Sequence, residues 1–444
     1  MQSLLWYNDN SFNTVHMKNL VICFNLVLEG GGYMKYLNIR MIAHLIIIGI
    51  IAGLTGTILI IFMHTIQHYA FGYGSYSETS FREIVEYVSP WRRLFVLLIC
   101  GIIVGLGWKC IHQYGQAIVS VETAVNNPRQ HMPFITTICH SLLQIITIAM
   151  GSPLGRETAP REITAAFATK MISLWHIDEQ NGRLLLSCAA GAGLAAVYNI
   201  PAASAVFTLE TLIRNWSFRS ISAVMLCCAT AAYVVRLGLG DSLQYSLPQA
   251  DFNETLIVWA AIVGPIIAIS VILFEKSLKI FSIVYQNSSK TIVIAILAFT
   301  AIGFMAMWCP EILGNGKAGN QLSFTYSINW QYGVALFGTK WLAVILAITA
   351  GAHGGRITPS MMLGGMLGLI LAIAWNEFFP IVAPGMAAFV CAATYLGLAQ
   401  RMPLTAVIFL LEMSRFSPEY LYPICVCLAT SLPVFMYLQE KCEI

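Results

Sequence analysis

Long stretches without Lys, Arg, Asp or Glu alternate with short polar segments along most of the chain. These charge-free stretches are 41–77, 94–108, 130–155, 184–209, 220–235, 255–274, 291–310, 341–355, 357–376, 378–400 and 420–439. A helix that crosses a bilayer needs ~20 mostly apolar residues, with a usual range of roughly 17–25. Several stretches reach this length, so the pattern predicts an all-α, polytopic membrane protein.

Two groups of shorter apolar stretches meet at segments rich in Gly and Pro, near 151–160 and 351–359. Such segments predict discontinuous helices that end inside the membrane. Irregular backbone at that depth is tolerated only where protein or a water-filled cavity surrounds it. A transport site is the usual reason for such a cavity.

Composition narrows the class of protein further. Charged residues make up 10% of the 444 residues and hydrophobic residues 58%, with a formal net charge of +3. An ordinary soluble domain carries about 25% charged residues. These values exclude a single soluble domain, a disordered chain, a disulfide scaffold and a nucleic-acid binder, which needs a strong basic excess.

The domain organisation follows from the same pattern. Residues 1–37 lack it, and we interpret them as an N-terminal leader that is either cytoplasmic or lies upstream of a true start at Met34. A first transmembrane repeat is predicted over 38–240 and a second over 250–438, with no soluble C-terminal domain. Basic residues near both ends favour cytoplasmic termini.

Cysteine and histidine patterns do not predict a cofactor. Most of the 12 cysteines lie in apolar runs, where Cys behaves as a small hydrophobe, and the chain has no CxxC pair. His64 and His68 have helical i, i+4 spacing, but nothing nearby in the sequence completes a metal site. We therefore expect neither a metal nor another cofactor.

An internal repeat points to the functional site. The segment Gly155-Arg156-Glu157-Thr158 reappears as Gly355-Arg356-Ile357-Thr358, and 201–210 matches 403–412. The two halves are therefore diverged copies of one unit. In transporters built from repeats, the site lies at the repeat interface near the bilayer midplane.

The repeated element has the chemistry of an anion site. A Gly-rich turn followed by a helix directs free backbone N–H groups and the positive end of the helix dipole at whatever lies ahead. Two such ends that converge from two halves bind a small anion without a buried cation. The alternative is that these Gly-Arg turns only cap helices at the membrane surface.

Glu157 is the position at which the copies differ, since Ile357 is its counterpart. An ionised carboxylate at this helix N-terminus competes with the substrate anion for the same N–H groups, whereas a protonated one swings away. Glu157 is thus predicted to be both gate and proton carrier. The structural alternative is an ion pair with Arg156 or Arg161.

Six segments together resemble the CLC chloride channel and transporter family, most nearly its bacterial voltage-gated ClcB-like type. They occur in the family's order and spacing: SPWRRL at 89–94, GSPLGRETAPRE at 151–162, AAGAGLAAVYNIPAASAVFTLE at 189–210, LGNG at 313–316, GAHGGRITPS at 351–360 and RMPLTAVIFLLEM at 401–413. The resemblance implies two inverted structural repeats of tilted and discontinuous helices. It also implies a homodimer with one pore per subunit.

The same resemblance assigns site residues by position. Glu157 corresponds to the gating glutamate, and the tyrosine that donates to the anion corresponds to Tyr420, with Tyr422 as the reserve. The implied anion-binding residues are Gln116, Arg156, Glu157, Thr158, Gly355, Arg356, Ile357 and Tyr420.

Three departures from the family pattern bear on the mechanism. Gln116 replaces the anion-coordinating serine, which leaves selectivity among anions open. Arg356 replaces an apolar residue, and it either raises anion affinity or extends to the membrane interface; His353 replaces a proline. Thr211, after Glu210, stands where proton exchangers of the family place an internal glutamate.

We therefore expect transport of a small inorganic anion, chloride first, across the cell inner membrane by a proton-coupled exchanger gated by Glu157. A passive voltage-gated channel and a fluoride-selective variant remain the alternatives. Glu210 and Thr211 mark a candidate internal proton path. An intramembrane enzyme is disfavoured because no nucleophile and base occur together in matched motifs and no HExxH is present.

Overall fold

The computed structural model describes residues 37–72, 81–127, 130–241, 244–245, 247, 253–281, 289–415 and 418–442. The first half contains α2 (Ile39–Phe71), α3 (Phe81–Tyr87), α4 (Pro90–Tyr114), α5 (Val121–Asn126), α6 (Phe134–Ala149), α7 (Thr158–Leu174), α8 (Glu179–Tyr198), α9 (Pro201–Phe207), the π-helical turn η1 (Thr208–Ile213) and α10 (Phe218–Leu239). The second half contains α11 (Thr255–Phe281), α12 (Ser289–Trp308), η2 (Pro310–Ile312), α13 (Lys317–Phe324), α14 (Trp330–Thr349), α15 (Ile357–Asn376), α16 (Pro384–Ala399), α17 (Pro403–Ser414), η3 (Pro418–Tyr420) and α18 (Leu421–Cys442).

Eight helices within the described residues are long and apolar enough to cross a bilayer: α2, α4, α10, α11, α12, α14, α15 and η3 with α18. Four apolar segments are shorter: α6, α9 with η1, α16 and α17. Helices of these lengths cannot all reach from one membrane face to the other. The predicted all-α, multi-pass fold with discontinuous helices is therefore confirmed.

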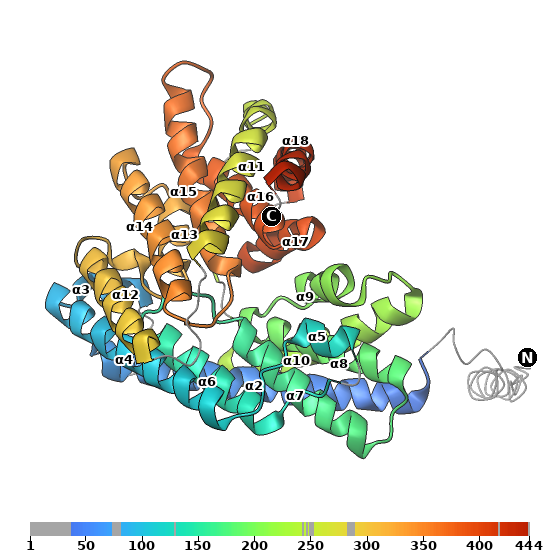
Figure 1. Cartoon of the computed structure of the whole chain (residues 1–444). Helices are drawn as coiled ribbons and strands as arrows, with labels where there is room; N and C mark the ends of the chain where they lie inside the picture. The colour runs from blue at the N-terminus through green and yellow to red at the C-terminus, as the bar shows by residue number, and fades with distance from the viewer. Residues whose placement is uncertain are drawn as a thin grey trace, which may run out of the picture.

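The two halves form two groups of helices that meet along the middle of the molecule (Figure 1). Helices α2, α6, α7, α8 and α10 lie together in the lower part of the view, and α11, α15, α16, α17 and α18 lie together in the upper part. Helix α12 departs from this division because it packs along α4 of the first half. The packing of α12 on α4 thus ties the second half to the first.

The two predicted breaks have the same backbone geometry. Helix α6 ends before Gly151 with a φ of 103°, and α14 ends before Gly351 with a φ of 79°. Residues with a Cβ rarely adopt φ values of this size, so glycine is favoured at both turns. Ser152 N–H then bonds Thr147 O at 2.9 Å, and Ala352 N–H bonds Ala347 O at 3.0 Å. The chain therefore leaves both helices by the same turn, 200 residues apart.

Two buried cations in the apolar interior satisfy backbone carbonyls. Arg93 donates through Nη1 to Ala306 O at 2.6 Å, at the end of α12. Lys340, which is fully buried, donates through Nζ to Ile312 O and Gly314 O, both at 2.9 Å. Carbonyls near helix ends have no intrahelical partner, so these side chains replace water there.

The predicted leader falls almost entirely on residues 1–36, outside the described part of the chain. The repeat boundaries at 240 and 250 stay predictions. The cysteines within the described residues are all free thiols. This agrees with their interpretation as small hydrophobes.

Candidate functional site

The two helix breaks meet each other at the centre of the molecule. Gly155 N–H donates to Gly355 O at 2.6 Å, and Gly355 N–H donates to Gly155 O at 2.8 Å. This antiparallel bridge is the one β-type pairing among the described residues. It fixes the start of α7 beside the start of α15, so the two helix N-termini predicted to converge do converge.

Glu157 lies at this junction and is 1% exposed. Its Oε1 accepts the backbone N–H of Ile357, the first residue of α15, at 2.8 Å. Its Oε2 accepts the Tyr198 hydroxyl at 3.0 Å. Tyr198 Oη is in turn 2.7 Å from Thr358 Oγ1. The carboxylate thus occupies a set of donors that suits a bound anion.

Among the described residues, Glu157 forms no ion pair with Arg156 or Arg161, which was the structural alternative for this carboxylate. Arg156 turns away: its Nη2 is 3.5 Å from Gln244 Oε1, and its guanidinium lies 5.6 Å from the Tyr198 ring centre. Arg161 stacks over the Phe207 ring at 4.5 Å. Glu157 is therefore held by a backbone N–H and a hydroxyl rather than by a guanidinium.

Gly155 and Gly355 leave the space that Glu157 fills. A Cβ on either glycine would overlap the Glu157 carboxylate, and at Gly355 the carboxylate is the nearest obstacle. Neither glycine has a positive φ. Their lack of a side chain is therefore needed for room and not for backbone conformation.

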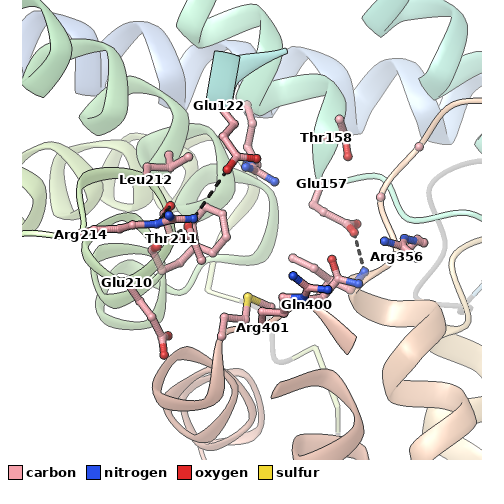
Figure 2. Close-up of a pocket in the computed structure, with 16 residues that line it drawn as sticks. Glu122, Glu157, Thr158, Glu210, Thr211, Leu212, Arg214, Arg356, Gln400 and Arg401 are labelled. Carbon is pink, nitrogen blue, oxygen red and sulfur yellow. Dashed lines mark hydrogen bonds and ion pairs between the residues drawn. The ribbon is translucent and has the colours of Figure 1, made fainter. Parts of the chain in front are cut away.

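A cavity of about 600 Å³ opens beside the junction. Figure 2 shows Glu157 and Arg356 at one side of it, Glu122 and Arg214 at the other, and Gln400 and Arg401 between them. Its lining residues come from both halves: Glu122, Glu157, Thr158, Arg161, Phe207, Glu210, Thr211, Leu212, Arg214, Gly354, Gly355, Arg356, Ile357, Gln400, Arg401 and Met402. The cavity therefore lies at the interface of the two halves, where the anion site is predicted.

The charge on the cavity wall depends on the state of Glu157. Four arginines and three glutamates line the cavity. Arg214 and Glu122 form an exposed pair at 3.7 Å, whereas Arg356 pairs with Glu275 of α11 through Nη1 at 2.8 Å. Counted with Glu275, the wall is neutral while Glu157 is ionised and has one excess positive charge once Glu157 is protonated. Proton arrival and anion binding at this wall are thus mutually favourable.

Glu210, a predicted proton-path residue, has a second set of contacts. Its carboxylate accepts the N–H groups of Leu404 and Thr405, at 3.0 and 2.8 Å, at the start of α17. Glu412 of α17 reciprocates by accepting the N–H groups of Ala202 and Ala203, at 3.0 and 2.7 Å, at the start of α9. Each half therefore caps a helix of the other with the glutamate that the repeat alignment pairs.

The remaining predicted residues are spread more widely. At the junction, the cavity is lined by Thr158, Gly355, Arg356 and Ile357. Thr211 also lines the cavity. Thr211 donates its hydroxyl to Phe207 O at 2.7 Å. Its assignment with Glu210 to a proton path stays a prediction.

Gln116 and the two candidate tyrosines do not line this cavity. Gln116 is exposed, and its backbone N–H donates to Thr136 Oγ1 at 3.1 Å. Tyr420 is 2% exposed, while Tyr422 is 63% exposed. Of the two tyrosines, Tyr420 is the one inside the protein. The assignment of Gln116 and Tyr420 to anion binding stays a prediction.

His64 and His68 acquire no further metal ligand. The described residues contain no group of three or more His, Cys, Asp or Glu side chains that could hold a metal ion.

Several residues of the site were not identified from the sequence. Tyr198 contacts Glu157 directly, and the cavity is also lined by Arg161, Glu122, Arg214, Gln400 and Arg401. Tyr198 lies within a segment that carried the family resemblance, but a tyrosine in an apolar helix resembles any core aromatic residue. Arg161 was considered only as an ion-pair partner for Glu157.

Comparisons with known proteins agree with the fold. The family model for voltage gated chloride channels matches residues 95–435. The chain is 24% identical over 387 residues to the H(+)/Cl(-) exchange transporter ClcA of Vibrio vulnificus, covering 83% of this chain and 81% of the relative. It is 25% identical over 350 residues to the voltage-gated ClC-type chloride channel ClcB of Escherichia coli, covering 74% and 80%.

Solved structures share the architecture at low sequence identity. A slow cyanobacterial Cl-/H+ antiporter superposes with a TM-score of 0.72 at 17% identity, covering 91% of this chain and 98% of the other. A CLC-type fluoride/proton antiporter superposes with a TM-score of 0.65 at 19% identity, covering 89% and 96%. The family match, over most of the chain, confirms the resemblance found in the motifs. The protein is a multi-pass membrane protein that belongs to the voltage-gated chloride channel (CLC) family.

Proposed function

We propose that this protein transports small inorganic anions, chloride foremost, across the cell inner membrane as a proton-coupled exchanger gated by Glu157. The observation that carries the proposal is the Glu157 carboxylate itself, which accepts the first N–H of α15 at 2.8 Å at the meeting point of the two halves. The name of the Vibrio relative, an H(+)/Cl(-) exchange transporter, supports the coupling.

The mechanism follows from competition for the same donors. Ionised Glu157 satisfies Ile357 N–H and Tyr198 O–H, so an anion cannot bind there. A proton on the carboxylate removes most of the attraction, the side chain swings out, and an anion takes its place at the helix N-termini. When the anion leaves, the deprotonated carboxylate returns. One residue thereby links anion movement to proton movement.

The cavity wall adds to this coupling. Arg161, Arg214, Arg356 and Arg401 keep the wall positive when Glu157 is protonated, which lowers the cost of an anion in the membrane interior. The site is built for reversible binding and release, in line with relatives that are named as transporters and channels.

Paired flux measurements in proteoliposomes test the proposal. A chloride gradient should drive protons uphill in vesicles that contain the natural protein. Glu157→Ala should keep chloride flux and abolish uphill proton movement, and Glu157→Gln should do the same because it mimics the protonated gate. Glu179→Gln, a change at an exposed glutamate paired with Arg183, is the matched control and should leave both fluxes unchanged.

The outcomes separate the alternatives. Chloride flux without proton movement in the natural protein would leave a passive channel in place of the exchanger. A parallel series with fluoride, chloride and nitrate measures the anion preference. This preference is of interest because Gln116 stands where the family has an anion-coordinating serine. Absence of flux for all three anions would remove the transport proposal.

The assembly is also part of the proposal. The family resemblance supports a homodimer with one pathway per subunit. The mass of the protein in detergent, measured by light scattering, should be that of two chains. A monomer that retains flux would contradict it.

A further inference from the structure

The two helix breaks use their arginines differently. Arg356 directly precedes Ile357, whose backbone N–H bonds the Glu157 carboxylate. Its Nη1 lies 2.8 Å from Oε1 of Glu275 on α11, and the two side chains are 32% and 20% exposed. Arg156, the counterpart in the first break, forms no ion pair among the described residues. The repeat therefore keeps an arginine at this position, but a carboxylate holds it in the second half.

Arg356 has donors left for a second partner. A guanidinium carries several N–H groups, and the bond to Glu275 uses one nitrogen, Nη1. Arg356 lines the cavity together with Gly355 and Ile357, whereas Glu275 is not among the described residues that line it. Figure 2 shows Arg356 at the same side of the cavity as Glu157. Glu275 thus holds one part of the guanidinium, and the rest is left for an anion at the cavity wall.

The side-chain donors that the family resemblance implies are not in this wall. Gln116 and Tyr420 are not among the described residues that line the cavity. The Tyr198 hydroxyl already bonds Glu157, at 3.0 Å. Arg356 is therefore well placed to supply the side-chain N–H groups that a bound anion needs beside the helix N-terminus.

The other three arginines of the wall are placed differently. Arg161 stacks over the Phe207 ring at 4.5 Å, and Arg214 pairs with Glu122 at the opposite side of the cavity (Figure 2). Arg401 lies in the exposed turn between α16 and α17. Of the four, the arginine of the second break is the one joined by a peptide bond to the N–H donor of the gate carboxylate.

The charge of Glu275 limits how strongly this wall attracts an anion. With Glu275 counted, the wall has one excess positive charge once Glu157 is protonated. A carboxylate in contact with a guanidinium competes electrostatically with a second anion for the same cation. Loss of the Glu275 charge should therefore strengthen anion binding while the gate stays in the same state.

The shape of a guanidinium favours one class of anion. Its planar fork matches two oxygen atoms of an oxyanion, so that two parallel hydrogen bonds form at once. A spherical halide cannot use this match and is attracted mainly by the charge. A wall that contains Arg356 should therefore strengthen the binding of a planar oxyanion, such as nitrate, more than the binding of chloride.

We infer that Arg356 is a side-chain donor of the anion site that strengthens binding of planar oxyanions relative to halides, and that Glu275 holds Arg356 in place and limits its affinity for anions. The inference rests on the proposed anion transport but not on the proposed coupling to protons. Arg356 acts as a specificity-determining residue, and Glu275 acts through it as a positioning residue.

The concentration dependence of chloride and nitrate flux in proteoliposomes tests both roles. Arg356→Met removes the charge and the fork, and it should raise the KM for chloride by about threefold to tenfold and the KM for nitrate by more. Arg356→Lys keeps the charge without the fork, so the KM for nitrate should rise by about threefold or more while that for chloride stays within about twofold. Glu275→Gln keeps an acceptor oxygen for Arg356 without the charge and should lower both KM values by about threefold or more.

A double variant separates charge from shape. With Arg356→Met and Glu275→Gln combined, three arginines and three glutamates remain in the wall, so its charge balance is that of the natural protein. The KM for chloride should return to within about twofold of the natural value, while the relative affinity for nitrate stays low. This variant leaves no unpaired carboxylate at Glu275, so it keeps the test decisive if Arg356→Met does not fold. Arg183→Met and Glu179→Gln, which break an exposed ion pair outside the cavity, are the matched controls and should change neither KM.

Three results would overturn the inference. Natural KM values for both anions in Arg356→Met would mean that the guanidinium does not contact the anion. Lower maximal flux at unchanged KM in Arg356→Met and Glu275→Gln alike would mean that the pair only supports the structure. A natural ratio of nitrate to chloride KM in Arg356→Lys would mean that the fork does not recognise oxyanions.

Failure of the proposed function gives a different result. Absence of flux for both anions in the natural protein would remove the transport proposal and this inference with it. Anion flux without proton movement would remove the coupling alone, and the KM values would still decide the roles of Arg356 and Glu275.

Discussion

Gly355 offers the sharpest test of how the gate works. A methyl group at this position would overlap the Glu157 carboxylate, which is the movable end of a side chain. Since Gly355 does not have a positive φ, alanine fits its backbone. We therefore predict that Gly355→Ala displaces the gate rather than unfolding the break.

The size of the effect follows from the contacts that are lost. Displaced Glu157 gives up the hydrogen bond from Ile357 N–H at 2.8 Å. A hydrogen bond to a charged group contributes about 1.5–3 kcal/mol. Each 1.4 kcal/mol is a factor of ten, so the ratio of open to closed gate should rise by about tenfold or more. Chloride flux should increase toward that of Glu157→Ala, and proton coupling should fall.

Chloride efflux and proton uptake in the same proteoliposomes measure both quantities. Gly338→Ala is the matched control, because a Cβ at that exposed helical glycine meets nothing within 4 Å. The double variant with Glu157→Ala isolates the cause. Once the gate side chain is gone, the extra methyl group should have no further effect on flux.

Two results would refute the reasoning. Gly355→Ala with natural flux and coupling would mean that the carboxylate does not need the space beside this glycine. A double variant that conducts much less than Glu157→Ala alone would mean that the methyl group blocks the anion path directly.

Two further predictions concern the contacts around the junction. Glu412→Gln weakens the charged cap on α9 and should lower the free energy of unfolding of the detergent-solubilised protein by about 1–3 kcal/mol. The Tm of this variant should fall, whereas the Tm of the control Glu179→Gln should not. Equal Tm values for the two variants would show that the cap does not stabilise the protein. Tyr198→Phe removes one hydrogen-bond donor to Glu157 and should raise chloride flux by about tenfold at neutral pH. The phenyl ring keeps the contact of this side chain with Phe409. Unchanged flux would show that the Tyr198 hydroxyl does not hold the gate closed.

The position of the site was predictable because it depends on local chemistry repeated in the chain. Gly151 and Gly351 mark turns that only glycine makes without strain, and the residues after each turn begin a helix. Helix N-termini present N–H groups whatever their surroundings. Repetition of this local pattern was enough to predict that two such ends belong to one site.

Partners across the junction were not predictable in the same way. The bond from Tyr198 to Glu157 joins residues 41 positions apart, and the reciprocal caps join residues about 200 apart. In an apolar helix, a core tyrosine and a tyrosine that bonds a buried carboxylate have the same sequence environment. The sequence contained one indication of the caps, because the repeat aligns Glu210 with Glu412. An alignment shows that two residues are equivalent in the two halves, but it does not show which residues they contact.

The sequence by itself determined that this chain crosses a membrane several times, that it consists of two related halves, and that Glu157 is the carboxylate that breaks their similarity. These properties follow from charge spacing, apolar length and repetition, which act along the chain. Only the tertiary structure decided what Glu157 touches and that His353, His140 and Glu162 lie together, because the neighbours of a buried polar group are set by how helices pack. In a membrane interior without water, those neighbours determine which groups can exchange a proton or hold an anion.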